Sequence, residues 1–316
     1  MQRVAIVGAG LIGRAWSLVF ARAGWEVRVT DPNDGVRNTL QACLRDDLAP
    51  LLKHGLSTSE ADILQRIAVV EDLPGALDGV TLVQENGPED VDAKCAIFTE
   101  LDRLAPRDAI LASSTSAIVA SLFTEKLQGR SRCLVAHPVN PPHLVPLVEL
   151  CGAPWTDPAV IERARSIYSS VGQSPITVAD EVEGFVLNRL QGALLAEAFR
   201  LVADGVVSSE DLDRTLKDGL GLRWSFMGPF ETIELNAPGG IRDYCERYCA
   251  FYARLADNPP TSAAFDERAR ESIADAWPHE PTTARLASRT AWRNDRLAAL
   301  RKHKEAFDHP DTGEPT

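Results

Sequence analysis

The sequence predicts an α/β protein, with a doubly wound, mainly parallel sheet domain followed by an all-helical domain. Short β-rich runs alternate with helical stretches through the first half of the chain, as they do in βαβ units. From about Glu181 onwards only helical periodicity continues. A chain of 316 residues also favours two separate cores. We therefore expect one domain at 1–181 and a second at 182–316.

The expected strands are apolar runs of five to seven residues. They are RVAIVG (3–8), EVRVTD (26–31), RIAVV (66–70), VTLVQE (80–85), AILASS (109–114), RCLVAH (132–137) and LVPLVEL (144–150). The first helix should end at Gly24, and two more helices should fill the segment 33–66. The second of these should begin at a capping box formed by Ser57 and Glu60. A long amphipathic helix is expected from Gly184 to Ala203.

Composition excludes several classes of function. The hydrophobic share of 45% is typical of a globular protein, and the net charge of −12 argues against nucleic acid or an anionic membrane as a partner. The six cysteines include no Cys-x-x-Cys pair, so we expect reduced thiols and no metal site. Neither a signal-peptide core nor a stretch of 18 apolar residues is present, which predicts a cytoplasmic protein.

A glycine pattern lies between the first strand and the first helix. Gly8, Gly10 and Gly13 form G-x-G-x-x-G, with Leu11 and Ile12 inside it. This is the Rossmann-type dinucleotide-binding pattern, in which the glycines permit a tight turn, the approach of a pyrophosphate and close helix packing. The helix N-terminus would then face the phosphates. The competing interpretation is a glycine turn without a ligand.

Asp31 ends the second strand, 18 residues beyond Gly13. A carboxylate in this position hydrogen-bonds a ribose 2′-hydroxyl and repels a 2′-phosphate, so NAD is favoured over NADP. Its ordinary alternative is a solvated aspartate. The joint match of strand, glycines, helix and acid predicts an NAD site.

Three polar residues lie at the carboxyl ends of expected strands, at the sheet edge where ligands bind in doubly wound folds. They are Glu85, Ser116 and His137. A histidine can take a hydroxyl proton near neutral pH, and Glu149 could hold its other ring nitrogen. Ser116 could hold a substrate oxygen. Taken singly, each residue has an ordinary structural role as its alternative.

The strings VGAGLIG, SSTS, AHPVNPP, LVEL and GFVLNRL, in this order, resemble the L-3-hydroxyacyl-CoA dehydrogenase family. Within it the chain is most similar to the branch of lambda-crystallins and L-gulonate 3-dehydrogenases, through EVEGFVLNRLQ and GLGLRWSFMGPFET. The resemblance covers almost the whole chain. It implies an NAD-binding domain and a helical domain that forms a homodimer.

The resemblance also implies roles for individual residues. The family's catalytic pair corresponds to His137 and Glu149, and its substrate-contacting residues correspond to Ser116 and Asn188. Its cofactor contacts correspond to Asp31, Glu85, Lys94, Ser116 and Asn140, beside the glycine loop. The prolines after His137 would then hold a loop that presents the base.

A free hydroxy acid needs a cation for its carboxylate, and Arg223 is the candidate because a guanidinium matches a carboxylate in geometry and charge. Its alternative is a surface ion pair with Asp218. The segment 33–66, where acyl-CoA relatives would receive CoA, holds four basic and five acidic residues, which disfavours a phosphate-rich ligand.

These patterns predict NAD-dependent oxidation of an L-3-hydroxy acid, with L-gulonate first among small-molecule substrates. A 3-hydroxyacyl-CoA dehydrogenase or a 3-ketoacid reductase is the alternative enzyme. A crystallin-like structural protein is the alternative from another class.

Overall fold

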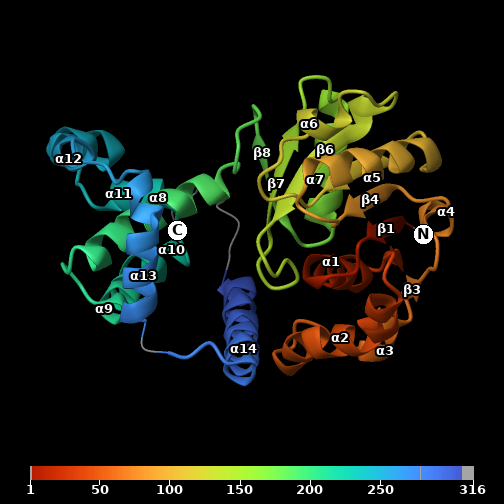
Figure 1. The fold of residues 1–316 in the computed structure, drawn as a ribbon, viewed down its shortest axis with the longest axis horizontal. Coiled ribbons are helices and arrows are strands. Elements are labelled where there is room, and N and C mark those ends of the chain that lie inside the picture. The colour runs from red at the N-terminus through yellow and green to blue at the C-terminus, as the bar shows by residue number, and fades with distance from the viewer. Residues whose placement is uncertain (1, 278, 308–316) are drawn as a thin grey trace. The chain divides into compact units, whose positions relative to one another are not determined.

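The computed structural model describes residues 2–277 and 279–307. The chain forms two compact units. In Figure 1 the colour of the ribbon follows the order of the sequence. The described residues up to Asn188 and from Leu286 onwards make the first unit, and Arg189–Arg285 make the second. The first stretch of the first unit ends at Asn188, a few residues beyond the expected boundary near Glu181. The sequence analysis did not predict that the chain returns to this unit from Leu286 onwards.

The first unit contains an eight-stranded sheet in the order β3-β2-β1-β4-β5-β6-β7-β8. Its strands are β1 (Arg3–Val7), β2 (Glu26–Thr30), β3 (Ile67–Val69), β4 (Leu82–Glu85), β5 (Ile110–Ser113), β6 (Cys133–Pro138), β7 (Leu147–Gly152) and β8 (Ser174–Val178). Neighbouring strands are parallel except for β6 and β7, which are antiparallel. The predicted doubly wound, mainly parallel α/β domain is confirmed. The last strand, β8, was not predicted.

Helices cover both faces of this sheet. Alternate residues of β1 enter different cores, Val4 and Ile6 on one face and Ala5 on the other. The first core receives side chains from α1 (Leu11–Arg22), α2 (Asp34–Lys53), α3 (Glu60–Leu64) and α7 (Pro158–Ser170). The second receives them from α4 (Leu73–Leu77), α5 (Val91–Leu104) and α6 (Ser121–Thr124).

Short polar side chains start the helices of this unit. Asn33 caps α2, Asp90 caps α5 and Asp157 caps α7, each accepting hydrogen bonds from backbone N–H groups of the first turn. The expected cap of α3 was wrong. Ser59, and not Ser57, accepts from Asp62 N at 3.2 Å, and the helix begins at Glu60.

The second unit is helical, as predicted. Its elements are most of α8 (Leu187–Ala203), then α9 (Ser209–Arg214), η2 (Thr215–Leu220), α10 (Gly221–Trp224), α11 (Pro229–Leu235), α12 (Gly240–Ala256), η3 (Ser262–Phe265) and α13 (Glu267–Ala276). Many large apolar side chains of this unit are exposed, among them Phe230 and Leu235. Among the described helices of the protein, none is long and apolar enough to cross a membrane.

The final helix, α14 (Thr283–Phe307), packs on the first unit. Ala298 is fully buried in the first core, and Leu297 packs beside it. Arg301 donates to the carbonyl oxygens of His143, at 3.0 Å, and Gly172, at 3.2 Å. These contacts tie the C-terminal helix to loops that lie near the ends of β6 and β8.

Candidate active site

The glycine loop has the geometry that its pattern predicts. Gly8 has φ +92°, and a Cβ there would lie 2.7 Å from Asn86 O. A Cβ on Gly13 would lie 1.8 Å from Gly8 O, so only glycine lets α1 pack this closely on the loop. Gly10, the N-cap residue of α1, faces open space. Leu11 is exposed and Ile12 packs against the core. The first helical N–H groups are therefore accessible to a pyrophosphate.

Asp31 lies directly against this loop. Its Oδ2 accepts from Ala9 N at 2.8 Å and its Oδ1 from Asn33 N at 2.9 Å. With Gly8 and Gly10 it lines a cavity of about 690 Å³. The Arg37 guanidinium lies beside Asp31 and donates to its carbonyl and to the Asp34 carboxylate. The cavity, the open Gly10 and the acid fit a dinucleotide.

Glu85 and Lys94 form an ion pair with almost no exposure, at 3.0 and 3.2 Å between Nζ and the two carboxylate oxygens. Glu85 also accepts from Ser113 Oγ at 2.6 Å and from Gly87 N at 2.5 Å. Because these donors compensate the buried charge, the pair fixes the turn after β4. That turn faces Gly8, and a direct contact of either side chain with the cofactor stays a prediction.

His137 and Glu149 face each other across the antiparallel pair β6 and β7. His137 Nδ1 lies 2.7 Å from Glu149 Oε2, and both residues are buried. A proton on Nδ1 donated to this carboxylate leaves Nε2 unprotonated in the neutral ring. Nε2 makes no hydrogen bond within the described part of the chain. The arrangement can accept a proton at Nε2.

Glu149 accepts two further hydrogen bonds, from Val186 N and Leu187 N, both at 2.9 Å to Oε1. Burial alone would raise the pKa of the Glu149 carboxyl. The hydrogen bonds from His137 and the two backbone N–H groups outweigh burial and hold this pKa below its usual value. The carboxylate therefore stays ionised and can stabilise a positive charge on His137.

An unusual backbone conformation supplies those two N–H groups. Phe185 has φ +49°, and Gly184 before it has φ +77°. A non-glycine residue in this region is strained by roughly 1–3 kcal/mol. The Phe185 side chain is fully buried, and its ring lies 5.6 Å from that of His137. Packing thus holds the turn that aims Val186 N and Leu187 N at Glu149.

Ser116 and Asn188 also come together, because Asn188 Nδ2 donates to Ser116 O at 2.8 Å. Glu89, which the sequence analysis did not single out, organises the serine loop. Its Oε1 accepts from Ser116 N at 2.9 Å, from Ala117 N at 3.0 Å and from the Thr115 hydroxyl. The only signal for Glu89 in the sequence was its place in the acidic stretch ENGPED.

The expectation that prolines hold His137 on a loop was wrong. His137 lies inside β6, which continues through Pro138, and its position depends on pairing with β7. Asn140 follows the strand, is exposed, and makes no hydrogen bond within the described residues. Its proposed contact with the cofactor stays a prediction.

Arg223 belongs to the second unit, on α10, and its side chain is exposed. The alternative of an ion pair with Asp218 is wrong, since Asp218 lies 3.4 Å from Lys217 and Arg223 has no carboxylate within 4.0 Å in the described part of the chain. Among the described residues no group of three or more His, Cys, Asp or Glu side chains has the arrangement of a metal site.

Comparisons with known proteins identify several relatives of this chain. The chain is similar to lambda-crystallin from Oryctolagus cuniculus, with 39% identity over 308 residues that cover 95% of this chain and 96% of that protein. An L-carnitine dehydrogenase from Pseudomonas sp is 33% identical over 301 residues, which cover 95% and 93%. A solved 5-formyl-3-hydroxy-2-methylpyridine 4-carboxylic acid 5-dehydrogenase, an NAD⁺-dependent dismutase, superposes with a TM-score of 0.85 at 26% identity, covering 96% of this chain and 99% of that one.

Two family models account for most of the sequence. Residues 3–182 match the NAD binding domain of 3-hydroxyacyl-CoA dehydrogenase, and residues 184–270 match its C-terminal domain. The cofactor is therefore NAD, as the glycine loop and Asp31 predicted. The chain belongs to the 3-hydroxyacyl-CoA dehydrogenase family.

Proposed function

We propose that this protein oxidises the 3-hydroxyl of a free L-3-hydroxy acid, with L-gulonate as the first candidate and 3-dehydro-L-gulonate as its product. The observation that carries the chemistry is the buried His137–Glu149 pair, with Nδ1 at 2.7 Å from the carboxylate. The likeness to an L-carnitine dehydrogenase over 95% of the chain supports a free acid as substrate.

A bound NAD would supply the acceptor for the hydride that leaves the carbon carrying the hydroxyl. His137 then serves as the general base, taking the hydroxyl proton at Nε2 while Nδ1 keeps its hydrogen bond to Glu149. Glu149 fixes the ring and stabilises the imidazolium through its ionised carboxylate. We propose that Ser116 and Asn188, joined by their hydrogen bond, hold the substrate oxygen.

The substrate's carboxylate requires a cation, and we propose Arg223 for this role. Its guanidinium has no carboxylate partner among the described residues. A thioester substrate would carry no charge to match it. L-carnitine, which is also a 3-hydroxy acid, is the second candidate substrate, because one relative is named L-carnitine dehydrogenase. A screen of NADH formation with L-gulonate, L-carnitine, L-3-hydroxybutyrate and 3-hydroxybutyryl-CoA distinguishes these substrates from the CoA alternative.

The protein should prefer NAD to NADP. In Asp31→Ala the ratio of kcat/KM for NAD over NADP should fall, because the mutation removes the carboxylate and leaves Arg37 near a 2′-phosphate. Steady-state kinetics with both cofactors measure this ratio. Glu71→Gln, at another acid of the same cavity, is the matched control and should leave the ratio unchanged. Equal efficiency of the unmodified enzyme with both cofactors would contradict the assignment.

Replacement of His137 by Asn should lower kcat by roughly 10²–10⁴ while NAD affinity is kept. His54→Asn is the matched control. Among the described residues, His54 is the other half-buried histidine that contacts a carboxylate, that of Asp295 at 2.9 Å. Stopped-flow measurement of hydride transfer and NAD titration provide the two readouts. Near-normal turnover of His137→Asn would exclude His137 as the base.

Glu149→Gln should slow turnover, because it removes the negative charge that stabilises the imidazolium. It should also change acid stability. The pKa of Glu149 is lowered in the fold, so its contribution to stability is present above the usual glutamate pKa and is lost as pH falls through the lowered value. Chemical denaturation between pH 3 and about pH 7 should show a weaker acid dependence in Glu149→Gln.

In Arg223→Met, KM for L-gulonate should rise roughly tenfold or more, while a neutral ester analogue should be affected little. The physical reason is that only the free acid carries a charge for the guanidinium to bind. Arg214→Met, at an arginine of the same unit that pairs with Asp211, is the control. Equal losses on both substrates would make Arg223 a structural residue and favour the CoA alternative.

We propose a homodimer that covers apolar side chains of the second unit. Phe230 is 72% exposed and Leu235 is 71% exposed. Soluble monomers rarely expose many large apolar side chains together. Replacing both by Glu should produce monomers in sedimentation velocity experiments. Leu122→Glu, at an exposed leucine of the first unit, should leave the dimer intact. A monomeric, fully active unmodified protein would disprove the proposal.

A further inference from the structure

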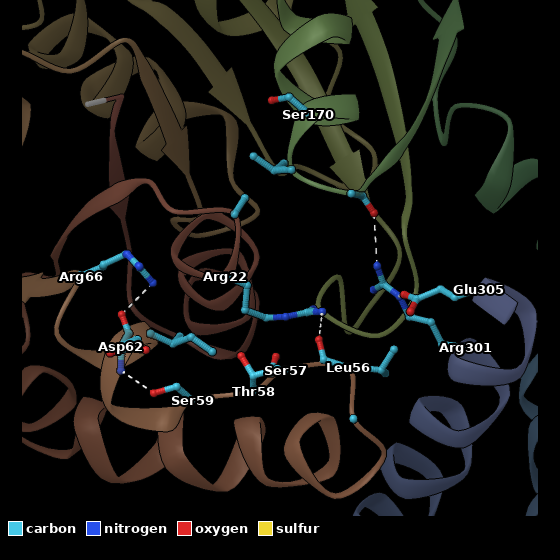
Figure 2. Close-up of a pocket in the computed structure, with 15 residues that line it drawn as sticks. Arg22, Leu56, Ser57, Thr58, Ser59, Asp62, Arg66, Ser170, Arg301 and Glu305 are labelled. Atoms are coloured by element: carbon cyan, nitrogen blue, oxygen red, sulfur yellow. Dashed lines mark hydrogen bonds and ion pairs between the residues drawn. The ribbon is translucent and has the colours of Figure 1, made fainter.

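A second cavity of the first unit, of about 610 Å³, lies outside the site described above. Its walls come from the end of α1, the segment after α2, α3, the end of α7 and α14 (Figure 2). It shares no lining residue with the cavity at the glycine loop. Its polar lining consists of three arginines, four hydroxyl residues and two acids, namely Arg22, Arg66, Arg301, Ser57, Thr58, Ser59, Ser170, Asp62 and Glu305.

Two of these guanidiniums are held by backbone carbonyls and not by acids. Arg22 donates to Leu56 O at 2.8 Å, and Arg66 donates to Asp62 O at 2.8 Å. Neither has a carboxylate within 4.0 Å in the part of the chain that the structure describes. Both side chains are half-buried. Carbonyl oxygens orient a guanidinium without neutralising its charge, so the positive charge remains.

The third guanidinium adds to this charge. Arg22 and Arg301 both donate to the carbonyl oxygen of His143, at 3.5 and 3.0 Å, so two like charges share one acceptor. Figure 2 shows Arg22 extended across the cavity toward the side where Arg301 enters from α14. Glu305 neutralises Arg301 in part, at 3.2 Å. In a protein with net charge −12, this concentration of arginines is a local exception.

The arginines also affect the pKa values of nearby groups. Burial and then Arg301 lower the pKa of Arg22 to about 10, although Glu305 acts in the opposite direction. Burial and the surrounding arginines, Arg22 first among them, lower the pKa of His143 to about 3. Burial, the larger cause for both groups, disfavours a charge of either sign, and the neighbouring arginines add a contribution that disfavours further positive charge.

Ser57 contributes a donor without a partner. Its Oγ is buried and makes no hydrogen bond, since Ser59 provides the cap of α3 instead. Ser57 lines the cavity, and a buried hydroxyl without a partner is costly unless a ligand or water completes it. An anion in the cavity would accept from this hydroxyl as well as from the arginines.

We propose that this cavity is a binding site for the phosphate group of a small molecule. The charge balance of segment 33–66 does not describe this cavity, because Asp62 is the one acid of that segment in its lining, whereas Arg22 and Arg301 come from outside the segment. Guanidiniums from α1, from the residue before β3 and from α14 approach from separate walls, together with the hydroxyl of Ser57. A tetrahedral phosphate dianion accepts donors from several directions, whereas a planar carboxylate is matched by a single guanidinium. A bound phosphate would link Arg301 of α14 to Arg22 and Arg66 and so fasten the C-terminal helix.

The test uses the full chain saturated with NAD, so that the cofactor site is occupied. Inorganic phosphate is titrated by calorimetry and by thermal denaturation, against chloride at matched ionic strength. Phosphate should bind at a single site and raise Tm. Arg66→Gln should weaken phosphate binding by roughly tenfold, the usual effect of losing one charged hydrogen bond. Arg165→Gln, at an exposed arginine of α7 outside the cavity, should bind like the unmodified protein.

Arg22→Gln should show the largest loss, but Arg22 also supports Leu56 and its variant could unfold. Arg66→Gln and Ser57→Ala therefore decide the question, with circular dichroism to confirm their folding. The same phosphate affinity in the unmodified protein and in both variants would overturn the proposal. Binding of malonate without binding of phosphate would overturn the phosphate assignment. Because the readout is binding, failure here leaves the proposed dehydrogenase activity untouched.

Discussion

The candidate active site depends on one buried carboxylate. Glu149 is fully buried, and a charge in that position is tolerated only with compensating donors. Three are present: His137 Nδ1 on Oε2, and two backbone N–H groups of the turn before α8 on Oε1. A single side chain thus orients the imidazole and anchors the entry to the long helix. Because Asn188 directly follows Leu187 in α8 and donates to Ser116 O, the same anchor positions the proposed substrate contacts.

Strand order explains why these groups lie near the cofactor loop. The sheet order reverses at β1 and β4, which places the glycine loop beside the turn that follows β4. Contact between the two is close, since a Cβ on Gly8 would lie 2.7 Å from Asn86 O. The Glu85–Lys94 pair stabilises that turn, because Glu85 accepts a hydrogen bond from Gly87 N. The cofactor loop and its neighbour therefore form one packed unit in which glycine is required by sterics.

Local patterns in the sequence were sufficient for the features that depend on local sterics or on strand ends. The glycine loop, Asp31 and the His137–Glu149 pair could be predicted because strand, turn and helix signals are contiguous. The features that escaped prediction depend on tertiary contacts. Nothing in α14 itself indicates that Ala298 packs on the first unit, and nothing around Glu89 distinguishes it from its acidic neighbours. Ser57 and Ser59 both fit a helix start, and only the observed backbone selects Ser59.

Buried charges of the first unit differ in how they are compensated. Glu85 is paired with Lys94, Asp102 with Arg132 and Glu149 with His137, each at 3.0 Å or less. Each pair has further hydrogen bonds, as a buried pair must have if removal of its charges from water is to be compensated. Arg22 and Arg66 depart from this pattern, because both are half-buried and their hydrogen bonds go to carbonyl oxygens. Glu305 opposes the charge of Arg22 without forming an ion pair with it. The three pairs compensate their buried charge within the chain, whereas Arg22 and Arg66 have no carboxylate within 4.0 Å among the described residues. At the proposed site the compensating charge would therefore come from a ligand.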